Sequence, residues 1–196
     1  MRSTKLIGAV ALGLALVACK KTETTTTNDT SITTNSDLNA SDMNASSGMA
    51  STSDAMPAQG FTDTVAASDM FEIQSGKLAE TMGSTAAVKD FGKMLVTDHT
   101  KSTDALKTAA AKTTPVVGLP MILPADLKAK ITALKATKGA DFDKLFIEQQ
   151  VAGHTAALDA LKAYGAGGDQ PSLKEFATTV IPTVQSHLDK LNAMPK

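Results

Sequence analysis

Three histidines are the residues of this chain whose type and spacing could do chemistry. Each shares one face of an expected helix with apolar residues three or four positions away, so each side chain is expected to face inward. They are His99, His154 and His187. Neutral imidazole nitrogens bind zinc, copper and iron in proteins. The pattern therefore supports the hypothesis of a transition-metal site inside a helical domain.

A carboxylate could complete such a site. Glu72 lies on a stripe with Val65 and Ala79 and is expected to face inward, whereas Glu148 falls on the outer face of its helix. Asp98, directly before His99, is a candidate hydrogen-bond partner for an imidazole. The predicted metal-ligand set is Glu72, His99, His154 and His187, with Asp98 supporting it.

A purely structural role for these residues is the alternative, with buried histidines hydrogen-bonded to neighbours such as Asp98. A di-iron centre is disfavoured, because it needs Glu-x-x-His and the positions three before the histidines are Val96, Val151 and Val184. No zinc-hydrolase or nucleophile motif is present, so the sequence indicates no catalytic residue. The cofactor therefore stays open, with a transition metal as one candidate.

The connection between the helices decides whether the imidazoles can meet. A rise of about 1.5 Å per residue places all four candidate ligands within roughly 9 Å of the middle of the bundle. If the connection crosses the whole bundle, as in ferritin, His99 and His187 are expected about 14 Å apart along the axis, too far for one metal. If the helices simply alternate up and down, the two imidazoles come together.

The elements that position these residues are helices, because apolar residues recur at helical spacing throughout 61–194. Four helices are expected. The first covers 61–82, and the second is capped by Ser84 and ends near residue 109. The third covers 141–164, and the fourth begins at Pro171. Short turns at Gly83 and at 165–168 make two antiparallel hairpins. The connection 113–139 contains three prolines and then a short amphipathic helix. The sequence thus predicts an all-α, ferritin-like four-helix bundle, two hairpins joined by a long connection.

The N-terminus predicts export and a lipid anchor. Residues 1–18 combine Arg2 and Lys5 with an uncharged run, which is typical of a secretory signal. The four residues that end at Cys19 resemble the lipobox of bacterial lipoproteins, whose cysteine is acylated. That resemblance implies an anchor on the periplasmic face of the outer membrane, since no Asp follows Cys19. Residues 19–60 are rich in Thr and Ser and are expected to form a disordered tether to a domain at 61–196.

The composition excludes further classes. Lys plus Arg number 19 against 20 for Asp plus Glu, so the formal net charge is −1 and no basic footprint for nucleic acid exists. A single cysteine allows neither an internal disulfide nor a zinc finger. The expected partner is the membrane, reached through the lipid; the protein partner and the oligomeric state are left open.

The pattern of residues 61–192 resembles a family of exported, ferritin-like bacterial proteins of unknown function, the domain of unknown function 4142. The matching segments are Glu72-Ile73, Val88-Lys89, Asp98-His99, Phe142-Asp143, Gln150-Val151, His154, Leu173-Lys174, Ile181-Pro182 and His187-Leu188. The resemblance implies the ferritin-like bundle and the cell envelope, and it supplies no activity, substrate or metal. Two hypotheses follow: a lipid-anchored binding or structural module, and a metal-binding redox or metal-storage protein.

Overall fold

The computed structural model describes residues 56–195 and shows helices and no strand in this part of the chain. The helices are α1 (Ala58–Met82), α2 (Ala86–Ala110), α3 (Ala125–Ala136), α4 (Gly139–Gly167) and α5 (Pro171–Ala193). The predicted signal peptide, Cys19 and nearly all of the predicted tether lie outside the described residues. Among the helices described, none combines the length and apolar character needed to cross a membrane.

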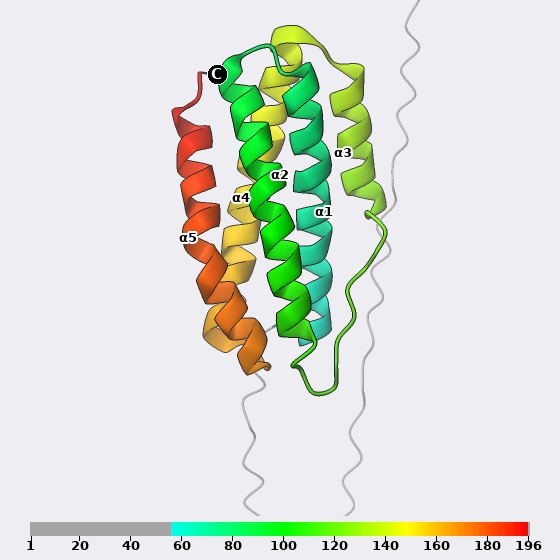
Figure 1. The fold of residues 1–196 in the computed structure, drawn as a ribbon, viewed down its shortest axis with the longest axis vertical. Helices are drawn as coiled ribbons and strands as arrows, with labels where there is room; N and C mark the ends of the chain where they lie inside the picture. Colours follow the sequence, from blue (N-terminus) through cyan, green and yellow to red (C-terminus); the bar gives the residue numbers. More distant parts are fainter. Residues whose placement is uncertain (1–55, 196) are drawn as a thin grey trace, which may run out of the picture. The chain divides into compact units, whose positions relative to one another are not determined.

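The bundle consists of two antiparallel hairpins, α1 with α2 and α4 with α5 (Figure 1). After α2 ends, the chain returns along the length of the bundle through 111–124 and α3, so that α4 starts at the same end as α2 (Figure 1). Helix α3 packs against α1 and α4. The predicted ferritin-like fold is confirmed, and of the two predicted topologies the structure has the one with the long crossover.

The bounds of α1 and α4 differ from the sequence prediction. Helix α4 runs on to Gly167, so most of the glycine segment predicted as a turn is helical. Helix α1 starts at Ala58, so the last three residues assigned to the tether are helical as well. Ser84 was expected to cap α2, but the cap is Thr85, whose Oγ1 accepts a hydrogen bond from the Val88 N–H at 3.3 Å.

The core has two apolar clusters with a polar layer between them. The cluster near the α4–α5 turn is built around Phe61, which stacks on Tyr164 with ring centroids 3.9 Å apart. The cluster near the α1–α2 turn contains Phe91, Phe142 and Phe146. Buried polar residues lie between them: Asp69, Glu72, Ser75, His99, Gln150, His154 and His187. Because polar groups are buried only where they are bonded or used, this layer is the place to look for function.

Asp143 ties the α1–α2 turn to α4. Its carboxylate accepts four hydrogen bonds of 2.8–2.9 Å, from the backbone N–H and the hydroxyl of both Ser84 and Thr85. Burial raises the pKa of Asp143, but these hydrogen bonds outweigh burial and the pKa lies below its ordinary value of 3.8.

Replacing Asp143 with alanine is expected to lower the free energy of unfolding by about 1.5–3 kcal/mol, the usual effect of losing hydrogen bonds to a charged group. Since the folded-state pKa is depressed, this contribution is complete above 3.8 and is lost as pH falls through the folded-state pKa. Urea unfolding at neutral and at acidic pH measures it, with Asp159→Ala on the exposed face of α4 as control. An equal deficit at both pH values would contradict the assignment.

Candidate metal centre

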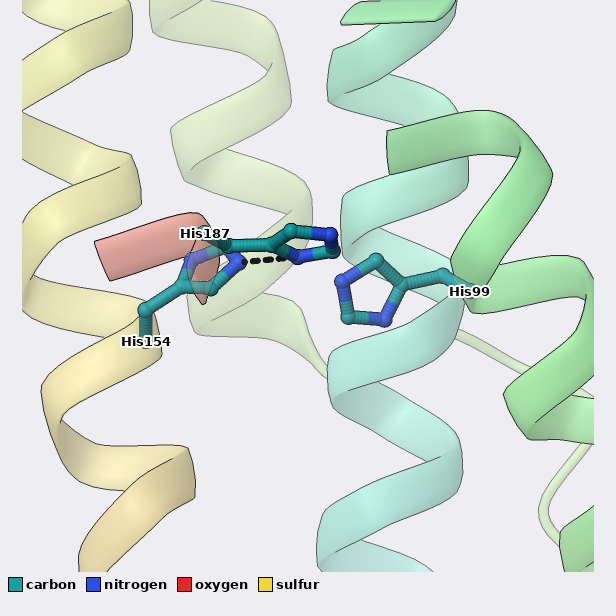
Figure 2. Close-up of side chains that lie close together, drawn as sticks. All are labelled: His99, His154 and His187. Atoms are coloured by element: carbon teal, nitrogen blue, oxygen red, sulfur yellow. Dashed lines mark hydrogen bonds between the residues drawn. The ribbon is translucent and has the colours of Figure 1, made fainter. Parts of the chain in front are cut away.

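The three histidines meet inside the polar layer, each from a different helix (Figure 2). His99 lies on α2, His154 on α4 and His187 on α5, and their exposed fractions are 7%, 1% and 2%. One nitrogen from each ring lies within 4.8 Å of the other two, and the ring centroids are 5.3–5.7 Å apart. The predicted inward orientation is confirmed for all three.

The predicted 14 Å separation of His99 and His187 in the crossover topology is wrong. A turn at 165–168 would put His154 and His187 at different levels, but α4 ends at Gly167 and α5 starts at Pro171. His154 lies 13 residues before the end of α4 and His187 lies 16 residues after the start of α5, which places them nearly level. Since α2 and α4 start at the same end, His99 reaches this level too.

Each ring donates a hydrogen bond from its outer nitrogen to an oxygen acceptor. His99 Nδ1 lies 2.8 Å from Asp69 Oδ1, and His154 Nδ1 lies 2.9 Å from the backbone carbonyl of Gln150. His187 Nε2 lies 3.2 Å from Asp98 Oδ2. A carbonyl or carboxylate oxygen only accepts, so the ring proton stays on the outer nitrogen in every case. This is how proteins orient histidines that bind metals.

When the rings are neutral, the inner nitrogens consequently present their lone pairs toward one another. They are His99 Nε2, His154 Nε2 and His187 Nδ1. The last two are 3.3 Å apart. The ligand nitrogens of a tetrahedral ion with bonds of about 2.0–2.1 Å lie about 3.4 Å apart, so this pair already has the required spacing. His99 Nε2 is buried and has no hydrogen-bond partner within residues 56–195, which leaves it available to a metal.

The environment keeps two of the rings neutral. Burial lowers the pKa of His154 to about 3, and the charge on His99 contributes to this shift. Burial also lowers the pKa of His187, partly offset by the hydrogen bond to Asp98. For His99, burial lowers the pKa, but the hydrogen bond to Asp69 and the nearby carboxylates outweigh burial and raise it above 6.5. At neutral pH, His154 and His187 can therefore bind a metal without losing a proton.

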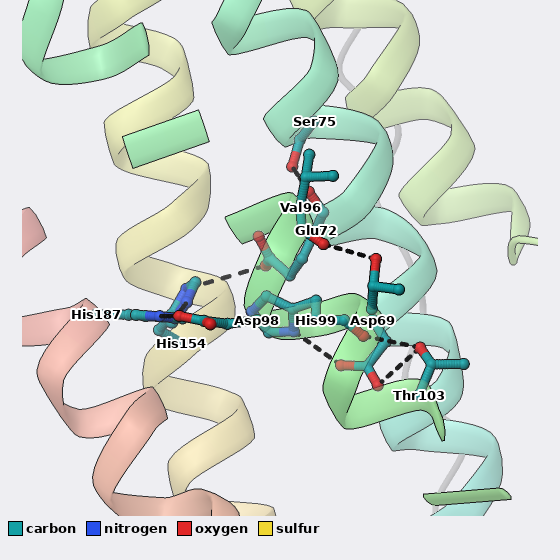
Figure 3. A network of polar contacts seen from close by, with 10 residues as sticks. Asp69, Glu72, Ser75, Val96, Asp98, His99, Thr103, His154 and His187 are labelled. Atoms are coloured by element: carbon teal, nitrogen blue, oxygen red, sulfur yellow. Dashed lines mark hydrogen bonds and ion pairs between the residues drawn. The ribbon is translucent and has the colours of Figure 1, made fainter. Parts of the chain in front are cut away.

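Glu72 lies next to the cluster but does not join the group of mutually close ligand atoms. It is 1% exposed, and its Oε1 lies 3.9 Å from the outer nitrogen of His154 (Figure 3). Burial raises the pKa of Glu72 to about 7. Its Oε2 has no hydrogen-bond partner in the described part of the chain. A cation or a hydrogen-bond donor placed beside this carboxyl would be stabilised.

Asp69 is a site residue that the sequence analysis missed. It is 2% exposed, and besides holding His99 it accepts a hydrogen bond from Thr103 Oγ1 at 3.2 Å (Figure 3). A signal was present, because Asp69 lies three residues before Glu72 and four after Val65 on the same stripe. Asp98, the candidate hydrogen-bond partner of an imidazole, accepts a hydrogen bond from His187 and not from the adjacent His99. Glu148 is exposed, in agreement with its predicted outward position.

Fold and site together define a ferritin-like helical bundle with a buried cluster of three histidines. The chain belongs to the family described as a domain of unknown function (DUF4142), which matches residues 39–194. Its fold is similar to that of the solved structure titled CopM in the Cu(I)-bound form, with a TM-score of 0.58 and 14% sequence identity, over 70% of this chain and 94% of that chain. No curated protein matches the sequence.

Proposed function

We propose that this protein binds a transition-metal ion, copper first of all, through His99, His154 and His187. The observation that carries the proposal is that all three rings donate outward to fixed oxygen acceptors and leave their second nitrogens within 4.8 Å of one another. A purely structural cluster would also satisfy its outer N–H groups, but it would not leave the buried His99 Nε2 without a hydrogen-bond partner among residues 56–195. Neutral imidazoles without thiolates suit copper, zinc and iron, and they exclude a dedicated calcium or magnesium site.

Copper is preferred for two reasons. It forms the most stable complexes among the divalent first-row ions with a given nitrogen site. The solved structure of similar fold is titled as a Cu(I)-bound form, and a buried site of three imidazoles is chemically suited to copper in both oxidation states. The role proposed is binding or storage of the ion, or its redox chemistry, in place of a purely structural bundle.

Metal analysis and thermal unfolding of the purified protein test this proposal. One equivalent of copper is expected to stay bound after gel filtration. Copper at a hundred times its dissociation constant adds about 2.7 kcal/mol, which raises Tm by roughly 5–10 °C. A variant with all three histidines changed to alanine should show neither effect, and zinc serves as the comparison ion. A wild-type protein that binds no copper and keeps its Tm would disprove the proposal.

We also propose that the protein is held at the cell envelope by a lipid on Cys19. The support is the lipobox-like sequence Leu16–Cys19 after a signal-like segment. Acylation with several chains provides stable anchoring, because each buried methylene contributes about 0.8 kcal/mol. On expression in a bacterium with an outer membrane, wild type should partition into detergent and carry acyl groups by mass spectrometry. Cys19→Ser should appear in the aqueous phase; recovery of unacylated wild type there would refute the anchor.

A further inference from the structure

A cavity of about 620 Å³ lies against the histidine cluster. All five helices contribute to its lining, and His99, His187 and Glu72 form part of its wall. Cavities of about 300–1,000 Å³ are typical of small-molecule sites. The size of this cavity exceeds what a metal ion with a bound water would need.

The space comes from a run of small residues on α4. In the apolar cluster near the α1–α2 turn this helix carries Phe142 and Phe146, but five of its six residues that line the cavity are glycine or alanine. These five residues are Ala152, Gly153, Ala156, Ala157 and Ala160, and the sixth is Leu161. Larger side chains at these positions would fill the cavity, so the cavity exists because these residues are small. Ala156 is exposed, and the cavity therefore opens to solvent.

Two residues of the cavity lining, His99 and Glu72, each carry a buried polar atom without a partner among residues 56–195, His99 Nε2 and Glu72 Oε2. By surface area the lining is mostly apolar, although it also includes hydroxyl groups such as Ser102 and the charged side chains of Asp69, Asp98, Lys101, Asp126 and Lys130. A largely apolar cavity that also presents polar groups is the form that binding sites for small organic molecules take.

Resting on the proposed metal site, we propose that this cavity binds a small molecule with an apolar body and one metal-coordinating nitrogen or oxygen. Three histidines leave one position of a tetrahedral ion open, as in metal sites that accept an outside ligand. The coordinating head takes that position, and the apolar body lies against the small residues of α4. Glu72 is placed to accept a hydrogen bond from the head group.

Titration of the copper(II)-loaded protein with imidazole and with 4-phenylimidazole tests the inference. Both probes have the same coordinating head, and only the second has an apolar body. Both are expected to change the electron paramagnetic resonance spectrum of the copper, and 4-phenylimidazole is expected to bind at least tenfold more tightly. Ala157→Leu, which fills the cavity, should remove this preference. Ala163→Leu, on an exposed position of α4 outside the lining, should keep it.

Copper content is measured first in every variant, so that the two proposals are tested separately. If copper binds in one equivalent but neither probe changes the spectrum, or the preference for 4-phenylimidazole is absent or survives Ala157→Leu, the inference is overturned and the metal site stands. If the wild type binds no copper, both are overturned. Ser102→Leu fills the cavity from α2 and replaces Ala157→Leu should that variant fail to fold.

Discussion

Replacing His154 with alanine is expected to weaken copper binding at least a hundredfold while leaving the bundle folded. His154 is the most deeply buried of the three rings at 1% exposed, and burial holds its pKa at about 3, so it is a neutral ligand over the whole physiological range. The binding free energy of a structural metal site is roughly 10–16 kcal/mol for four ligands, or about 3 kcal/mol for each ligand. Because about 1.4 kcal/mol corresponds to a tenfold change in affinity, the loss of one ligand corresponds to about a hundredfold.

Isothermal titration with copper, together with circular dichroism, measures this effect. Glu148→Ala is the matched control, because Glu148 lies on the same helix with its side chain exposed. That variant should bind copper as tightly as the wild type. Should His154→Ala keep wild-type affinity at one equivalent, copper would be bound elsewhere in the chain and the three-histidine site would be abandoned.

The fold could be predicted because each helix buries one face, and the residues on that face recur in the sequence at helical spacing. The end of α4 could not be predicted in this way. Gly165 reads as a turn residue, yet in the structure a Cβ at this position would lie 3.2 Å from Thr178 Cγ2 on α5. A larger residue would therefore require Thr178 to shift, and the helix continues through this position to Gly167 despite the weak helical propensity of glycine.

The inward orientation of the three histidines could be predicted for the same reason, since each orientation depends only on its own helix. That the three rings lie at the same level of the bundle could not be predicted, because it depends on where three helices begin and end. An error of a few residues at each boundary adds about 1.5 Å per residue, enough to turn a contact into the predicted gap. The pairing of Asp69 with His99 depends on the register between α1 and α2, which no pattern within one helix contains.

Changing Asp69 to asparagine is expected to lower copper affinity by about 10–100-fold, the usual effect of removing the partner that orients a histidine ligand. The change also has a signature in pH. The hydrogen bond to Asp69 raises the pKa of His99, so the wild type should lose affinity as pH falls through a value above 6.5, where protonation of Nε2 competes with the metal. Without the carboxylate that pKa drops, and the loss should begin at lower pH.

Copper titrations over a series of pH values, with the His99 ring followed by NMR in the metal-free protein, measure both effects. Asp63→Asn, exposed on α1, is the control and should match the wild type at every pH. A residue that only filled space at position 69 would change affinity equally at all pH values. Such a uniform change, with the His99 titration unmoved, would show that Asp69 does not tune the imidazole and that the orientation of His99 arises from packing alone.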